Sequence, residues 1–173
     1  STNHLKETYQ AITDIDILYL TNKNFKSVVV TGTNGKSTTC KLLSHLLKKN
    51  KFQVLLGGNI GTPILDLKIK KNSYIVIEAS SFQLSHSKFI RPDYAFLLNI
   101  TNDHLDWHGN MSNYTNSKLK IFINQKKNQF SLTNEKLKKT FKKRKFLGKL
   151  IVPKKNNYKK IKNKIKNNYL KLN

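Results

Sequence analysis

The sequence contains one cysteine, two arginines and few acidic residues, and it has no long hydrophobic run. Because Cys40 is the single cysteine, no intramolecular disulfide can form, which is typical of proteins from a reducing compartment. No apolar stretch approaches the ~20 residues that cross a bilayer, and the N-terminal residues lack the apolar core of a signal peptide. These absences argue against a disulfide-stabilised or membrane-spanning protein and predict a cytoplasmic one.

The acidic residues number nine, against 33 lysines and arginines, which gives a formal net charge of +24. The excess lies mainly in the C-terminal part, where 20 basic residues and a single acid, Glu135, occur from Lys118 onward. Such a basic half could meet nucleic acid, an anionic membrane surface or phosphorylated substrates. Arginine is preferred for bidentate contacts to phosphates and bases, however, and only Arg91 and Arg144 are present. We therefore interpret the basic composition as a solvated surface and expect neither a membrane partner nor a nucleic-acid partner.

The stretch TGTNGKST (31–38) lies between a β-branched run and a segment of helical periodicity. In the order strand, glycine-rich turn, helix, backbone N–H groups and a helix N-terminus can bind phosphate oxygens. Lys36 would reach the β- and γ-phosphates of a nucleotide, and the Ser37 hydroxyl would bind Mg²⁺. The general phosphate-loop pattern has a glycine where this chain has Val30, so the loop is a shortened variant. The predicted phosphate-binding residues are Gly32, Thr33, Asn34, Gly35, Lys36, Ser37 and Thr38.

Glycine-rich or polar residues also follow three further predicted strands. GGNIG (57–61) follows a strand over 52–56, Glu78 follows a strand over 73–77, and residues 101–106 follow a strand over 94–100. Ligands of open α/β sheets bind at these carboxyl ends. A buried carboxylate there needs an ion pair or a metal ion, and both explanations stay open for Glu78. His104 can offer a ring nitrogen to a divalent ion, although a structural role is open as well. Trp107 and His108, which follow it, are expected at the rim of this site.

Apolar strands alternate with helical segments along the chain. Further strands are predicted over 129–133 and 147–152, and helices over 41–49, 110–124, 135–143 and 158–169. This alternation predicts an α/β fold with a three-layer, mostly parallel sheet. We expect residues 1–26 to be a lead-in from a missing N-terminal domain and residues 27–173 to form the main domain.

Four motifs stand in order along the chain: TGTNGKST (31–38), GGNIG (57–61), EASSFQL (78–84) and NITNDHLDWHG (99–109), followed by Tyr114 and Lys118. Together they closely resemble the central ATP-binding domain of the Mur ligases of bacterial peptidoglycan synthesis. The SSFQL element is most similar to the members that add D-glutamate to UDP-MurNAc-L-alanine. The resemblance is dense over residues 27–123 and weak in the basic tail. It implies that the family's N-terminal and C-terminal domains and the end of the central domain are missing, so that the fragment alone would be inactive.

The resemblance also implies a mechanism and a cofactor. These ligases use ATP to phosphorylate a substrate carboxylate, and an amine then displaces phosphate from the acyl phosphate. Ser37 and Glu78 would hold one Mg²⁺ and His104 a second, while Lys36 and the loop hold the ATP phosphates. Lys118 matches the lysine that is carbamylated in the family, and a carbamate would supply an anionic oxygen ligand to the second ion.

By the same resemblance, the catalytic residues would be Lys36, His104 and Lys118. Asn59, Ser80 and Gln83 would contact UDP-MurNAc-L-alanine, and D-glutamate would be the second substrate. Independently of the resemblance, we expect a monomer. Three alternatives stay open. The chain could belong to another Mur-type or folylpolyglutamate-type ligase, since these share the glycine loop and the DH element. It could also be a basic P-loop module that binds nucleic acid, or a fragment without function.

Overall fold

The computed structural model describes residues 12–21 and 24–153, which form strands alternating with helices. The strands are β1 (Phe25–Thr31), β2 (Val54–Gly58), β3 (Ser73–Glu78), β4 (Tyr94–Leu97), β5 (Phe130–Thr133) and β6 (Lys149–Ile151). The helices are α1 (Asp14–Thr21), α2 (Lys36–Lys49), the short 3₁₀ turn η1 (Ile64–Asp66), α3 (Ser81–His86), α4 (Leu105–His108), α5 (Met111–Ile123) and α6 (Glu135–Lys143). No described helix is both long and apolar enough to cross a membrane.

The strands form one six-stranded sheet in the order β2-β3-β1-β4-β5-β6, and every strand pairing among the described residues is parallel. The predicted α/β class is therefore confirmed. The chain moves from β1 to the β2 side first and crosses to β4 later, so the switch point of the strand order lies beside the carboxyl end of β1. Ligands of open α/β sheets bind at such a point.

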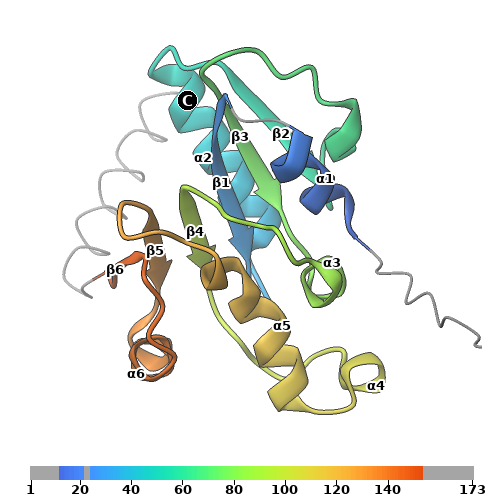
Figure 1. Cartoon of the computed structure of the whole chain (residues 1–173), viewed down its shortest axis with the longest axis vertical. Helices are drawn as coiled ribbons and strands as arrows, with labels where there is room; N and C mark the ends of the chain where they lie inside the picture. Colours follow the sequence, from blue (N-terminus) through green and yellow to red (C-terminus); the bar gives the residue numbers. More distant parts are fainter. Residues whose placement is uncertain (1–11, 22–23, 154–173) are drawn as a thin grey trace, which may run out of the picture.

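Helices cover both faces of the sheet and complete three layers (Figure 1). Successive side chains of a strand point to opposite faces, so Val28 and Val30 pack with Cys40 of α2 while Val29 packs in the cluster with residues of α1, α3 and α5. The central strands are apolar on both faces, as expected for a parallel sheet covered on each side.

Helix α1, which lies in the predicted lead-in, packs into the main core. Its Ile15 and Leu18 are 0% and 2% exposed. The buried carboxylate of Asp16 accepts hydrogen bonds from Ser87 Oγ at 2.6 Å and from the backbone N–H of Phe89 at 2.8 Å. The described part of the lead-in is thus tied to the loop before β4.

Several element bounds differ from the sequence predictions. Strand β2 begins at Val54 rather than at residue 52, and β4 ends at Leu97 rather than at residue 100. After β4 the chain turns to the loop that follows β1, where the N–H of Leu98 still donates to the carbonyl of Thr31 at 3.0 Å. Helix α6 matches its predicted bounds, whereas α3 and α4 were not predicted as helices. The amphipathic helix predicted over 158–169 lies outside the described residues.

Candidate functional site

The glycine loop lies between the carboxyl end of β1 and the first turn of α2, at the centre of the sheet. Gly35 precedes α2 with a φ of 83°, a left-handed conformation that favours glycine. Among the residues that the structure describes, no side chain caps this end of α2, and the first turn of α2 carries no acidic residue. The first N–H groups of a helix lack partners within the helix and carry partial positive charge, so the loop presents the electrostatics of an anion site.

Asn99, directly after β4, holds the loop in place. Its side-chain oxygen accepts from the N–H of Asn34 at 2.9 Å, and its side-chain nitrogen donates to the carbonyl of Asn34 at 3.0 Å. Its own carbonyl accepts from the N–H of Thr33 at 3.0 Å. Asn99 lies in a motif singled out in the sequence, but only the adjacency of β1 and β4 gives it this part in the site.

Two lysines converge on one backbone oxygen of the loop. Lys36 Nζ donates to the carbonyl of Gly32 at 3.0 Å, and Lys118 Nζ donates to the same oxygen at 2.9 Å. Lys118 is 1% exposed. Burial, followed by repulsion from Lys36, lowers its pKa to about 8. Two ammonium groups beside a helix N-terminus form a strongly positive centre that an anion would neutralise.

Glu78 ends β3, in register with Val30 of β1, and so lies on the strand next to the loop. It is 1% exposed, and its Oε1 accepts from Asn59 Nδ2 at 3.2 Å. Its Oε2 is buried and has no hydrogen-bond partner in the described part of the chain. Within the described ranges no ion pair joins Glu78 to a cation, so the ion-pair explanation finds no support there. A buried, unpaired carboxylate oxygen is costly, and it fits a divalent cation such as Mg²⁺.

His104 follows β4 and adopts a φ of 51°, which is uncommon for a residue other than glycine. Such conformations concentrate at functional sites. Its Nε2 lies 3.4 Å from Asp103 Oδ2, and its ring packs against Phe82 and Tyr114 with centroid distances of 4.9 and 6.3 Å. The side chain is 45% exposed, so a ligand can reach it.

Ser80 and Gln83 are engaged with each other at the start of α3. Ser80 Oγ accepts from the N–H of Gln83 at 3.2 Å, and Gln83 Oε1 accepts from the N–H of Ser80 at 3.1 Å. This capping box starts α3 two residues after Glu78. The pair thus has a structural role that the S-x-x-Q pattern could have revealed, and its contact with a substrate stays a prediction.

His108 was expected at the rim of the site together with Trp107. Trp107 is 49% exposed, but His108 is only 6% exposed, with Nε2 3.0 Å from Ser81 Oγ. Burial, and then the nearby charge of Lys118, lowers the pKa of His108. The expectation is wrong for His108 because its ring joins α4 to α3 inside the structure.

Among the described residues no group of three or more His, Cys, Asp or Glu side chains is placed to hold a metal ion. Magnesium in nucleotide sites usually has only one or two protein carboxylates and takes its other ligands from phosphates and water. The unpaired oxygen of Glu78 and the hydroxyl of Ser37 at the start of α2 are a donor set of that kind.

A shortened glycine loop at the switch point of a parallel sheet, followed directly by a lysine and an uncapped helix, defines a P-loop type of α/β domain. A family profile, "Mur ligase middle domain", matches residues 30–171. The chain belongs to the Mur ligase family.

Curated relatives and a solved structure agree with this assignment. The chain is 47% identical over 123 residues to a UDP-N-acetylmuramoylalanine–D-glutamate ligase of Rickettsia felis, which covers 71% of this chain and 27% of that protein. It is 40% identical over 124 residues to the ligase of the same name from Natranaerobius thermophilus, covering 70% and 27%. The structure of a MurF ligase from Thermotoga maritima in complex with ADP matches with a TM-score of 0.63 and 27% identity, covering 88% of this chain and 39% of that one. The chain thus spans 27% of the length of these curated relatives.

Proposed function

We propose that this chain is the ATP-binding core of a cytoplasmic ligase that adds D-glutamate to UDP-MurNAc-L-alanine through an acyl-phosphate intermediate. The observation that carries the proposal is the buried, unpaired oxygen of Glu78 on the strand next to the two-lysine loop. The names of the curated relatives support the choice of D-glutamate.

The chemistry explains why the loop is needed. Amide formation from a carboxylate is uphill in water, so the carboxylate must first be phosphorylated. Phosphoryl transfer depends mainly on positioning and on neutralising charge. Lys36 and the loop N–H groups would bind the β- and γ-phosphates, and Lys36 would exchange its bonds to Gly32 and Thr33 for phosphate oxygens. The same positive centre would orient the γ-phosphate toward the substrate carboxylate.

Two magnesium sites belong to the proposal. Ser37 and Glu78 would hold one ion, and His104 and a carbamylated Lys118 would hold the other. Bound Mg²⁺ neutralises phosphate charge and draws the γ-phosphate and the carboxylate together. The lowered pKa of Lys118 supports carbamylation, because the neutral amine attacks CO₂ and releases a proton as the N–C bond forms. The product is an anionic oxygen ligand.

The substrate contacts are proposed from the resemblance. Asn59, Ser80 and Gln83 lie at or just beyond the carboxyl ends of β2 and β3, beside Glu78, and this placement supports a role at UDP-MurNAc-L-alanine. We expect the 173 residues by themselves to bind nucleotide, as a monomer, without completing the ligation. Completing it would require the parts that the longer relatives contain.

Substitution of Lys36 tests the proposal. In the product of the complete reading frame, Lys36→Ala should abolish phosphate release dependent on both UDP-MurNAc-L-alanine and D-glutamate. In the 173-residue chain it should abolish MgADP binding measured by calorimetry. Lys41→Ala, an exposed lysine on the same helix, is the control. Retained turnover in Lys36→Ala would contradict the site, and turnover with a folate acceptor or another amino acid would select the alternative ligase type.

A further inference from the structure

Tyr114 of α5 contacts three parts of the proposed site at once. Its side chain is 0% exposed and lies among the phosphate loop, Lys118 and His104. A buried tyrosine is often only a core residue, so the details of its contacts decide whether it does more.

The hydroxyl of Tyr114 completes the bonding of Thr33 in the loop. Thr33 Oγ1 accepts from the N–H of Thr101 at 3.0 Å and donates to the carbonyl of Thr101 at 3.3 Å. It lies 3.0 Å from the hydroxyl of Tyr114. Because the single hydrogen of Thr33 is used at Thr101, Tyr114 is the donor of this third bond.

The ring of Tyr114 supports the two residues on the other side. In the unmodified side chain, Lys118 Nζ lies 4.7 Å from the ring centroid, a cation–π contact that the protonated amine makes before any carbamylation. The ring of His104 meets it edge-on, with centroids 6.3 Å apart and an interplanar angle of 70°. His108 packs against it at 5.1 Å and holds the neighbouring helix in place. One rigid side chain therefore spans the distance between the loop and both side chains.

We infer that Tyr114 is a positioning residue of the nucleotide site, whose hydroxyl fixes the phosphate loop and whose ring holds Lys118 and His104 at a set distance from it. This inference rests on the proposed function. The two halves of the role are separable by substitution. Tyr114→Phe keeps the ring and removes the bond to Thr33, while Tyr114→Leu removes both contacts.

Calorimetric titration of the 173-residue chain with MgADP tests the hydroxyl. Tyr114→Phe should weaken binding about fivefold, the equivalent of the ~1 kcal/mol that one hydrogen bond contributes. Tyr74→Phe is the matched control, because it removes the hydroxyl of a tyrosine on β3 that packs against Phe52. In a Thr33→Val background, Tyr114→Phe should cause no further loss, since the bond is already absent.

The ring is tested by NMR. The ε-methylene protons of Lys118 should be shifted upfield in the wild-type chain by the ring current of Tyr114. This shift should persist in Tyr114→Phe and disappear in Tyr114→Leu, which reports whether the ring lies over Lys118 in solution.

The outcomes distinguish this inference from the proposed function. Wild-type binding of MgADP with unchanged affinity in Tyr114→Phe would overturn the inference and leave the proposed function standing. Failure of the wild-type chain to bind MgADP would count against both. An upfield shift that persists in folded Tyr114→Leu would refute the part assigned to the ring.

Discussion

Lys118 is the residue with the most unusual environment in the chain. An almost fully buried ammonium group is costly, and here it is stabilised by the carbonyl of Gly32 and the face of Tyr114. Among the described residues neither of these partners is a carboxylate. Burial, and then repulsion from Lys36, lowers the pKa of Lys118 to about 8 against the opposing effect of Asp103. With this pKa roughly a tenth of the amine is neutral at pH 7, far more than for an ordinary lysine, and the neutral form can react with CO₂.

Replacement of this side chain tests its proposed chemistry. Lys118→Ala in the complete enzyme should lose most of its activity, and short carboxylic acids should restore part of it by supplying the missing anionic oxygen. Initial rates of phosphate release, with and without added acetate, are the measurement. Lys126→Ala, an exposed lysine after α5, should keep full activity and gain nothing from acetate. A fully active Lys118→Ala enzyme would refute the carbamate role.

At the scale of elements, the anchoring of α1 depends on Asp16. Burial raises the pKa of this carboxyl, but hydrogen bonds from Ser87, Phe89 and Lys88 outweigh that effect and lower it below the usual 3.8. A carboxyl with a lowered folded pKa contributes stability above its unfolded pKa and loses it as the pH falls through the folded value. The hydrogen bonds that hold α1 to the loop before β4 should therefore weaken at pH values below about 4.

Asp16→Asn should lower the free energy of unfolding at pH 7 by about 1–3 kcal/mol, because one oxygen that accepts bonds becomes a donor. The difference from wild type should shrink as the pH is lowered below ~4, since the wild-type carboxyl is then protonated. Urea midpoints between pH 3 and 7 give the comparison, with Asp14→Asn on the same helix as the control. Parallel pH curves for Asp16→Asn and wild type would contradict this account.

The sequence predicted elements whose signal is local. Apolar runs marked the central strands, and α6 has the bounds that were expected from its helical pattern. Helix α3 has six residues, too few for a period to show, so it was missed. The end of β4 and the clamp of Asn99 on the loop were not predictable, because they arise from pairing with β1 some 65 positions away in the sequence.

The same distinction holds inside the site. The motif and its flanking strand pointed to the phosphate loop, and the position of Glu78 after a buried strand pointed to a carboxylate at the sheet edge. The sharing of the Gly32 carbonyl by Lys36 and Lys118 joins residues 86 positions apart and follows only from the fold. The link from Tyr114 to Thr33 likewise joins residues 81 positions apart and has no trace in local periodicity.

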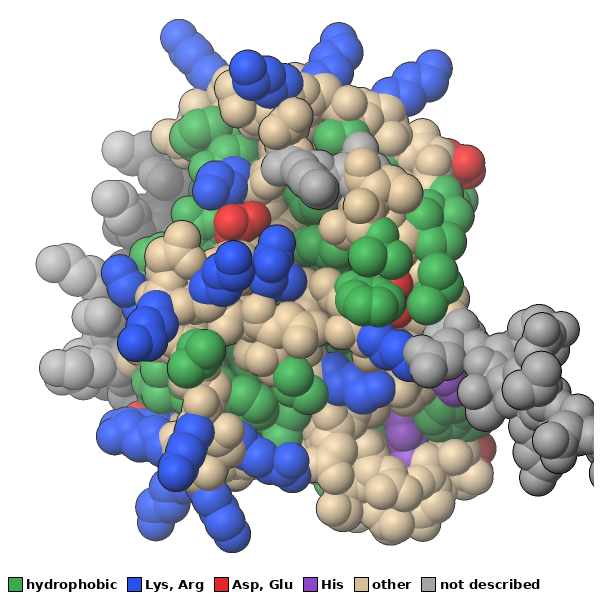
Figure 2. Space-filling view, viewed as in Figure 1, with side chains coloured by type: hydrophobic (Ala, Val, Ile, Leu, Met, Phe, Trp, Pro, Cys, Tyr) green, Lys and Arg blue, Asp and Glu red, His purple; other side chains and the backbone are tan. Residues whose placement is uncertain are grey.

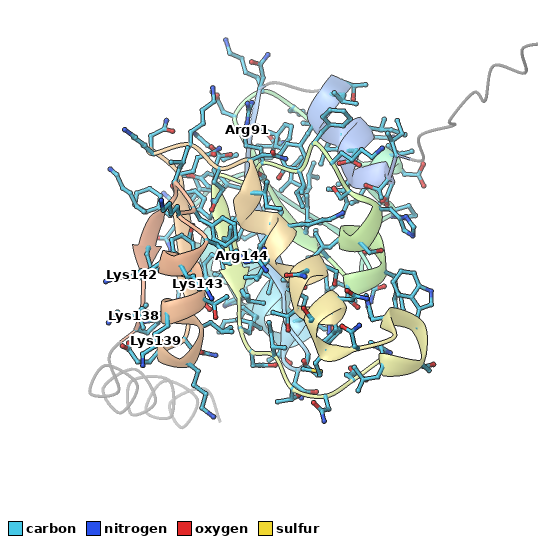
Figure 3. The ribbon with its side chains drawn as sticks, turned by 60° about the horizontal axis from the view of Figure 1, so that its bottom comes forward. Arg91, Lys138, Lys139, Lys142, Lys143 and Arg144 are labelled. Atoms are coloured by element: carbon cyan, nitrogen blue, oxygen red, sulfur yellow. The ribbon has the colours of Figure 1, made fainter. Side chains whose placement is uncertain are left out.

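The whole molecule carries a strong positive charge whose described part is most concentrated around α6. Lys138, Lys139, Lys142 and Lys143 project from this helix (Figure 3), and lysines gather over it on the face shown in Figure 2. Arg144 follows the last residue of α6 and donates to Asn116 of α5. The apolar side of α6 is occupied, since Phe141 is 4% exposed and packs against Phe122 and Phe146. Within the described ranges, Lys138–Glu135 is the single ion pair of this helix.

The salt dependence of binding distinguishes a nucleic-acid-binding role of these lysines from a solvated surface. Contact with RNA through these lysines should fall steeply between ~50 and ~200 mM salt, because each neutralised phosphate releases counterions. MgADP binding at the loop should change far less. The triple variant Lys139→Gln/Lys142→Gln/Lys143→Gln should reduce RNA retention and leave MgADP affinity intact, with Lys70→Gln/Lys71→Gln as the control. RNA binding that withstands physiological salt would favour the nucleic-acid alternative over the ligase core.

The oxygen shared by Lys36 and Lys118 belongs to the main chain, so no substitution can delete it and only a change of backbone path can displace it. The backbone path at Gly32 requires a residue without a side chain. An added Cβ would lie 3.1 Å from Leu98 Cβ and 3.3 Å from the backbone nitrogen of Asn99. A single uncharged methyl group at position 32 would therefore disturb two cationic centres together. The electrostatics of this site are thus sensitive to a substitution that leaves the net charge of the chain unchanged.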